Sequence, residues 1–191
     1  MNFIRQVVYY KNRNENYMHP EVKKLIDYFQ FERIPLEGTL YKSTYRSAAS
    51  FTDHVPAGTA IIALYCREPF SESAFHRLSR DETWHFYKGD PFKLFLLYED
   101  GSSAEVIMGA DILAGHHVQF TVPAGVWQAG SLLPDSDYAL FGCTMTPGFT
   151  VDCFESGIAS ELVVKYPHQK DIILKFAPNS TETRLPDGYE G

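Results

Sequence analysis

Residues 73–89, SAFHRLSRDETWHFYKG, decide the fold of this chain. The stretch predicts two short β-strands joined by a polar turn at residues 79–81. Side chains along a strand point alternately to its two faces. His76 therefore shares a face with the apolar residues two positions before and after it, and Glu82 shares a face with Trp84. We expect both polar side chains to point into the interior of a β structure, where a carboxylate must be paired, hydrogen-bonded or protonated.

The same period of two extends along the chain on both sides of this stretch. Short segments rich in β-branched and aromatic residues are separated by turn signals, of which Asp100-Gly101 is the strongest for a hairpin. Nine such strands with almost no helical period between them predict an all-β sandwich or barrel, and exclude a parallel βαβ winding. The predicted strands are residues 39–46, 59–65, 73–78, 83–89, 93–99, 103–109, 117–122, 126–131 and 138–144.

Helical periodicity is confined to the two ends of the chain. Apolar residues at helical spacing predict a helix over residues 19–30, before a barrel at about 39–149. Two apolar stretches broken by Pro167 predict short helices within residues 150–178. Residues 179–191 contain few apolar side chains, so we expect a mobile tail. The 191 residues suit a single domain.

Composition limits the compartment and the partners. The 17 basic and 24 acidic side chains give a net charge of −7, which argues against nucleic acid or an anionic membrane as partner. No apolar run approaches the roughly 18 residues of a membrane span, and MNFIRQVVYY lacks the core of a signal peptide. We therefore expect a cytoplasmic protein. Cys66, Cys143 and Cys153 show no CxxC spacing, which predicts buried thiols rather than a disulfide frame or zinc site.

Two short motifs resemble those of the cupin superfamily. Residues 76–82, followed after six residues by Gly89, resemble the first cupin motif, in which H-x-H-x-x-x-E precedes a glycine. Residues 123–128, PAGVWQ, resemble the second motif, P-x-G-x-x-H. Each motif is short, but the two occur in the family's order within a nine-strand pattern. The resemblance implies a double-stranded β-helix, or jelly roll, with an N-terminal helix and short C-terminal helices.

More narrowly, residues 20–155 resemble the uncharacterised "cupin five" family of single-domain cupins. Glu37-Gly38 matches a Glu-Gly pair of that family, although Pro35-Leu36 stands here where the family usually has His-Pro. The resemblance implies a homodimer and adds Glu37 to the candidate ligand-binding residues. The segments that carry it are residues 73–78, 81–86, 122–129, 142–144 and 147–149.

The chain departs from the metal-binding cupins at two of their four ligand positions. Leu78 stands at the second histidine position and Gln128 at the last, which leaves only His76 and Glu82. A histidine, a carboxylate and an amide oxygen make a poor ligand set for iron, manganese or nickel. We therefore expect no metal and no cofactor.

Without a metal, the barrel becomes a pocket for a small organic molecule. His76 is the candidate general base, because an imidazole titrates near neutral pH. Glu82 is the second candidate catalytic residue, placed to orient His76 or to keep it protonated. The remaining candidates offer amide groups, an aromatic surface or a positive charge to a ligand. They are Glu37, Gln119, Gln128, Trp84 and Arg46.

Two classes of function remain open for such a pocket. The first is a metal-independent isomerase or epimerase of a sugar-like or hydroxy-acid substrate, with His76 removing a proton beside a carbonyl. This chemistry also needs an acid, and the sequence singles out none. The second is a non-catalytic protein that binds or senses a small molecule. A metal-dependent dioxygenase is a third, weaker alternative.

Overall fold

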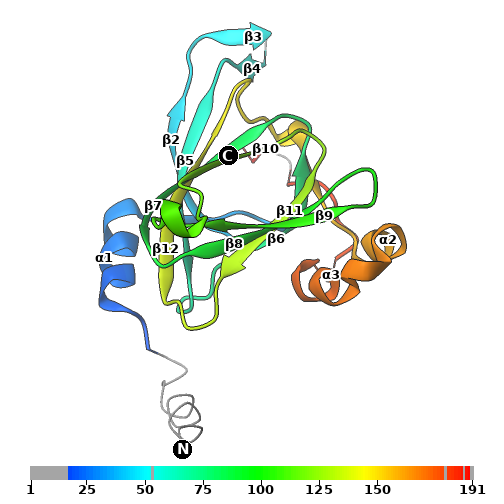
Figure 1. The fold of residues 1–191 in the computed structure, drawn as a ribbon. Helices are drawn as coiled ribbons and strands as arrows, with labels where there is room; N and C mark the ends of the chain where they lie inside the picture. Colours follow the sequence, from blue (N-terminus) through cyan, green and yellow to red (C-terminus); the bar gives the residue numbers. More distant parts are fainter. Residues whose placement is uncertain (1–16, 53, 179, 187, 190–191) are drawn as a thin grey trace, which may run out of the picture.

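The structure is a computed structural model that describes residues 17–52, 54–178, 180–186 and 188–189. Two antiparallel sheets face each other and enclose a core (Figure 1). In spatial order, one sheet contains β1 (Glu32–Arg33), β2 (Leu40–Arg46), β5 (Thr59–Cys66), β12 (Tyr138–Met145), β7 (Glu82–Gly89) and β10 (Gln119–Val122). The other contains β13 (Phe154–Ser156), β6 (Ser73–Leu78), β11 (Trp127–Leu132), β8 (Phe92–Leu97) and β9 (Ser103–Met108). A hairpin of β3 (Ser50–Thr52) and β4 (Val55–Pro56) projects from one end.

This architecture confirms the predicted all-β barrel with helices at its two ends. Each of the nine predicted strands is present, with ends that differ from the predicted ones by two residues or fewer. The strands β1, β3, β4 and β13 were not predicted from the sequence, because two or three residues are too few to show a period of two. The Asp100-Gly101 turn joins β8 to β9 as expected, with Gly101 at a positive φ of 88°.

In the five-stranded sheet, both faces of β8 are largely buried, which explains the continuous apolar run in this strand. Leu94 packs in the barrel interior, whereas the adjacent Phe95 packs on the outer face beneath two helices. These helices are α2 (Ala159–Lys165) and α3 (Lys170–Phe176), which lie side by side under this sheet (Figure 1). Each fully buried large apolar side chain contributes about 1.5–3 kcal/mol.

The N-terminal helix α1 (Pro20–Phe29) covers part of the outer face of the six-stranded sheet. Its first turn is capped by His19, whose Nδ1 accepts a hydrogen bond from the backbone N–H of Glu21 at 3.1 Å. Val22 is its buried residue and packs against Leu64. None of the described helices is long and apolar enough to cross a membrane.

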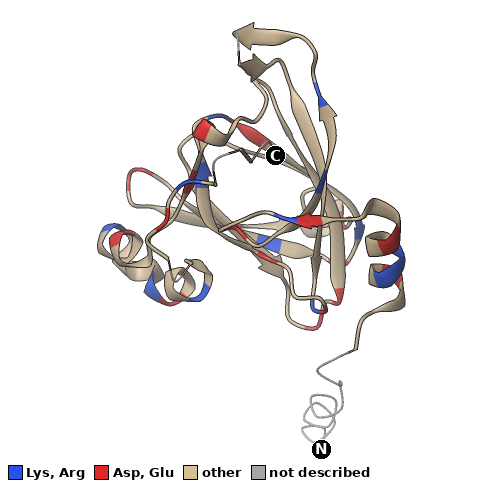
Figure 2. Ribbon diagram, turned by 180° about the vertical axis from the view of Figure 1, so that it is seen from behind, with Lys and Arg blue, Asp and Glu red and all other residues tan. Residues whose placement is uncertain are grey.

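Charged side chains add little to the stability of the barrel. Basic and acidic positions are interspersed over strands, turns and helices (Figure 2). The ion pairs Lys23–Asp27 and Lys42–Glu32 involve exposed side chains, and such pairs contribute little. All three cysteines are buried free thiols, as expected from the sequence.

Part of the C-terminal tail packs against the barrel. Leu185 is only 4% exposed and joins an apolar cluster with Leu78 and Phe154. The carbonyl of Thr183 accepts a hydrogen bond from the backbone N–H of Ser156 at 2.8 Å. The mobility expected for residues 179–191 stays a prediction, and four residues of this segment lie outside the described residues: 179, 187, 190 and 191.

Candidate functional site

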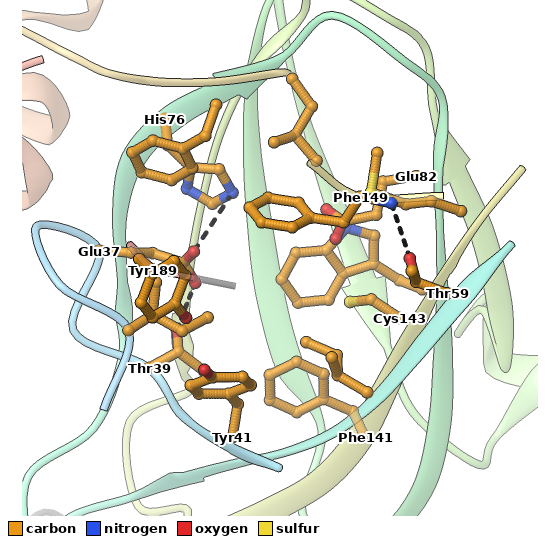
Figure 3. A pocket seen from close by; sticks show the side chains of 16 residues that line it. Glu37, Thr39, Tyr41, Thr59, His76, Glu82, Phe141, Cys143, Phe149 and Tyr189 are labelled. Atoms are coloured by element: carbon orange, nitrogen blue, oxygen red, sulfur yellow. Dashed lines mark hydrogen bonds and ion pairs between the residues drawn. The ribbon is translucent and has the colours of Figure 1, made fainter. Parts of the chain in front are cut away.

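A small cavity of about 60 Å³ lies between the two sheets. Because one water molecule needs roughly 10–15 Å³ of cavity volume, this cavity has room for about four to six water-sized groups. Most of its wall is aromatic or aliphatic, and a few polar side chains converge on it (Figure 3). The polar and ionisable residues that line it are Glu37, Thr39, Tyr41, Thr59, His76, Glu82, Cys143 and Tyr189.

His76 faces the cavity from β6, as the alternation of that strand predicts, and it is 2% exposed. Its Nδ1 lies 2.8 Å from the carbonyl oxygen of Ala74. Since a carbonyl only accepts hydrogen bonds, Nδ1 carries the proton in this contact. Nε2 lies 3.8 Å from Glu37 Oε2 (Figure 3). The ring stacks on Phe154 with 5.5 Å between centroids. In the neutral ring, Nε2 is therefore the atom that can accept a proton.

Glu37 reaches His76 from a tight turn between β1 and β2. Its backbone N–H donates to the carbonyl of Pro35 at 2.7 Å, which closes a three-residue turn with Leu36 at its centre. Leu36 has a φ of 65°, a left-handed conformation that is strained for a leucine, and Gly38 follows with a φ of 98°. Residues held in this way cluster at functional sites because the surrounding structure must support the strain.

The Glu37 carboxylate is fixed by a buried hydrogen-bond network. Its Oε1 accepts from Thr39 Oγ1 at 2.5 Å and from Ser73 Oγ at 2.9 Å, which leaves Oε2 for His76. The Tyr65 hydroxyl hydrogen-bonds Ser73 Oγ behind this pair. Burial raises the pKa of Tyr65 well above its ordinary value, so this hydroxyl remains a neutral donor.

Glu82 lies in the other sheet, on β7, where its charge still acts on that of His76, so its expected role toward the imidazole stays a prediction. The carboxylate at ion-pair distance from the imidazole belongs to another residue. Glu37 has that position instead, because the turn before β2 brings its carboxylate to the imidazole. Burial raises the pKa of Glu82, against the opposing effects of His76 and of a hydrogen bond from Gln128. The carboxyl group consequently holds its proton to a higher pH than an exposed glutamate does.

Gln128 lies directly behind the cavity wall, on β11 opposite His76. Its Nε2 donates to Glu82 Oε2 at 2.7 Å, and its Oε1 accepts from Trp84 Nε1 at 3.0 Å. With 1% exposure and both amide atoms engaged, Gln128 holds Glu82 and Trp84 in place. Trp84 itself lines the cavity, as expected, whereas Gln128 is absent from the lining of the described residues.

Two further expected ligand-binding residues, besides Gln128, lie outside the cavity. Gln119 is exposed on β10, and its Nε2 lies 3.4 Å from Nδ1 of His85 on the outer face of the sheet. Val122 is buried, and a residue three positions away on the same strand must face the opposite side. Arg46 is exposed at the end of β2, where its guanidinium donates to the carbonyl of Phe149 at 3.2 Å.

Sequence reasoning missed several residues of the site. Thr39 had a signal, since it follows Glu37 by two positions and such residues share a face of an extended chain. Ser73 and Cys143 lie on predicted strands among apolar neighbours, so nothing distinguished them from small core residues. Tyr189 comes from the C-terminal tail, which has no period, and burial raises the pKa of its hydroxyl beside Tyr41.

The residues at this site do not fit a metal ion. Leu78 offers no donor, and the Gln128 amide is occupied by Glu82 and Trp84. In the part of the chain that the structure describes, no group of three or more His, Cys, Asp or Glu side chains is arranged to hold a metal.

Comparison with known proteins gives a family and two similar structures. A family model described as "Cupin superfamily (DUF985)" matches residues 23–157. The fold is similar to that of a protein from Shewanella oneidensis, with 30% identity and a TM-score of 0.76 over 83% of this chain and 98% of that chain. A hypothetical protein from Leishmania major is similar at 29% identity and a TM-score of 0.74, over 81% and 97% of the two chains. No curated protein matches the sequence.

Proposed function

The chain belongs to the cupin superfamily, in its DUF985 family, and we propose that the cavity between its sheets transfers protons on a small organic molecule without a metal. The observation that carries this proposal is the arrangement of His76 with Glu37 on one side of the cavity and Glu82 on the other (Figure 3). Isomerases and epimerases that act beside a carbonyl need a base and an acid arranged in this way.

His76 is the general base of the proposed reaction. Its Nδ1–H is held by the carbonyl of Ala74, so Nε2 faces the cavity with a lone pair. When Nε2 accepts a proton, the Glu37 carboxylate at 3.8 Å stabilises the imidazolium that forms. Thr39 and Ser73 hold the carboxylate and act as positioning residues.

Glu82 is the general acid that sequence reasoning lacked. Gln128 Nε2–H donates to Glu82 Oε2, the Cys143 thiol is a second hydrogen-bond partner of this carboxyl group, and burial favours its protonated form. As His76 removes a proton from the carbon beside a carbonyl, Glu82 gives its proton to the carbonyl oxygen, and an enediol forms. His76 then returns its proton to carbon while Glu82 takes a proton from oxygen, so both residues regain their starting states.

The cavity also limits the size of the substrate. A sugar-like or hydroxy-acid substrate was expected, but about four to six water-sized groups correspond to a fragment smaller than a hexose. Tyr189 lines the cavity from the C-terminal tail, so a larger ligand requires this residue to move. The position of Tyr189 in the cavity wall also favours the second candidate function, a non-catalytic sensor in which ligand binding displaces the C-terminal tail.

We further propose that the chain is a cytoplasmic homodimer. Support comes from the six-stranded sheet, where Tyr45 and Tyr87 are large aromatic side chains exposed by half or more. A second copy packed on this sheet would bury them.

Deuterium exchange from solvent tests the catalytic proposal. Hydroxyacetone and lactate serve as the smallest sugar-like and hydroxy-acid probes, with exchange at carbon followed by NMR. We expect wild-type protein to accelerate exchange of at least one probe, and His76→Gln to lower that rate by about 100-fold or more, as for loss of a general base. His85→Gln is the matched control, since His85 lies on the outer face of β7. Binding of a probe without exchange would support the sensor, and equal rates in both variants would refute the role of His76.

A further inference from the structure

The ionisable groups of the cavity favour one sign of ligand charge. The described residues that line it include two carboxyl groups, Glu37 and Glu82, and one imidazole, His76, but no lysine or arginine. The imidazole already faces the Glu37 carboxylate. A buried anion is costly unless a positive group compensates it, and a carboxylate or phosphate placed here would find only an imidazole that already faces a carboxylate.

The arginines near the ends of β6 are engaged away from the cavity. Arg77 pairs with Glu155 at 2.7 Å, and its guanidinium lies over the ring of Trp127 on the outer face of the sheet. Arg80 donates to the carbonyl of Gly148 and to Thr150 Oγ1. Both guanidinium groups have partners that an anion in the cavity would not displace.

The remaining wall of the cavity is aromatic. The face of an aromatic ring carries partial negative charge and attracts cations, most strongly where water is excluded. Two of the rings, Trp84 and Phe141, stack with 5.1 Å between centroids and form a continuous apolar surface. The aromatic lining residues are Tyr41, Trp84, Phe141, Phe149, Phe154 and Tyr189.

We infer that this cavity binds a compact organic cation, an amine or amidine, and rejects carboxylates and phosphates. The inference rests on the proposed function only in taking this cavity as the ligand site. It favours the sensor over the enzyme, because a cation that displaces the Glu82 proton leaves no general acid for proton transfer. A cavity of about 60 Å³ accommodates a cation with about four to six non-hydrogen atoms. The cationic N–H groups donate to Glu82, and the aromatic rings surround the rest of the ligand.

Proton release accompanies the binding of such a cation. Burial favours the protonated form of Glu82, whereas a bound cation favours the carboxylate, so the ligand displaces the Glu82 proton. Affinity therefore increases as the pH rises towards the pKa of Glu82 in the free protein. The titratable groups whose charges act on or respond to Glu82 are Glu37, Tyr65, His76, Cys143 and Cys153.

Three nearly isosteric probes test the inference on the full chain: acetamidinium, acetamide and acetate. They differ mainly in charge, so calorimetric titration of wild-type protein isolates the charge preference. We expect acetamidinium to bind at least tenfold more tightly than acetamide, and acetate to show no binding. Glu82→Gln should remove most of the preference for acetamidinium. Glu105→Gln, which removes the same charge from an exposed position on β9, should leave it unchanged.

The wild-type titrations decide the matter even if Glu82→Gln does not fold. Acetate binding as tightly as acetamidinium, or no binding of acetamidinium at millimolar concentration, would overturn the inference. So would an equal effect of the Glu82 and Glu105 substitutions. The binding titrations and the deuterium-exchange assay can fail independently. Exchange that is confined to lactate would refute only the preference for cations. Binding of acetamidinium without exchange of any probe would refute only the proposed catalysis.

Discussion

Nε2 of His76 lies 3.8 Å from Oε2 of Glu37, which reaches the imidazole from a turn outside the sheet that carries His76. Glu37 precedes β2 of the six-stranded sheet, whereas His76 lies on β6 of the five-stranded sheet. The backbone joins them as well, since the N–H of Ala74 donates to the carbonyl of Glu37 at 2.8 Å. The imidazole and the carboxylate thus have a fixed relation in which a charge formed on His76 is stabilised.

The first prediction concerns Ser73, which links the Tyr65 hydroxyl to the Glu37 carboxylate. Ser73→Ala leaves a buried hydroxyl without its partner and should lower the free energy of unfolding by about 1–3 kcal/mol. Denaturant titration measures the loss, with Ser50→Ala on an exposed strand as control. A change as small as that of the control would contradict the proposed network.

The second prediction concerns the pH dependence of stability. The pKa of Glu82 is raised above its ordinary value of 4.5, so the folded state holds this proton more tightly than the unfolded state. The stabilisation that comes from binding this proton more tightly in the folded state is fully present below about pH 4.5. It is lost as the pH rises through the pKa of Glu82 in the folded protein.

Glu82→Gln removes this titration. The variant should therefore lose less stability than the wild type as the pH is raised from 4.5 towards neutral. Thermal or denaturant unfolding over that range gives the two profiles. If the two stability profiles run parallel over this pH range, the raised pKa of Glu82 is contradicted.

Much of the fold and part of the site were predictable from the sequence. Within β7, Glu82 and Trp84 are buried whereas Thr83 and His85 are half-buried, so the inward face of that strand could be assigned. On β6, His76 lies two positions from Ala74 and from Leu78 and was placed inward with them. His76 and Glu82 turned inward for that reason. Gln119 was misplaced because the same alternation was not applied to β10, where the buried Val122 places it outside.

The rest depends on contacts that no local pattern encodes. Glu37 meets His76 only because a turn with Leu36 at positive φ directs the carboxylate into the barrel. Neither the left-handed conformation of a leucine nor the distance between two sheets follows from propensity. Tyr189 likewise reaches the cavity from a segment without periodicity.

The third prediction concerns this tail. Tyr189 lines the cavity beside Tyr41, so Tyr189→Ala should enlarge the space available to a ligand. We expect the affinity for benzamidinium to rise about tenfold relative to that for acetamidinium, measured by calorimetry. Tyr28→Ala, at an exposed position of α1, is the control. An unchanged ratio of affinities would show that Tyr189 does not limit the size of the ligand.

The fourth prediction concerns assembly. Light scattering at micromolar concentration should give the mass of two chains. If the six-stranded sheet forms the contact, Tyr87→Glu should shift the equilibrium to monomer by placing a charge in an apolar interface. Leu113→Glu, at a fully exposed position, should not change the mass. A wild-type mass of one chain would contradict the homodimer.

Chemical rescue of His76→Gly tests the central claim most directly, because it separates the imidazole from the chain. The variant opens space where the ring lies against Phe154, and added imidazole can occupy it. With the variant shown to be folded, we predict that carbon–deuterium exchange is lost and then restored in proportion to the concentration of neutral imidazole. Exchange at the wild-type rate without imidazole, or a folded variant that imidazole does not rescue, would contradict the assignment of His76 as the base.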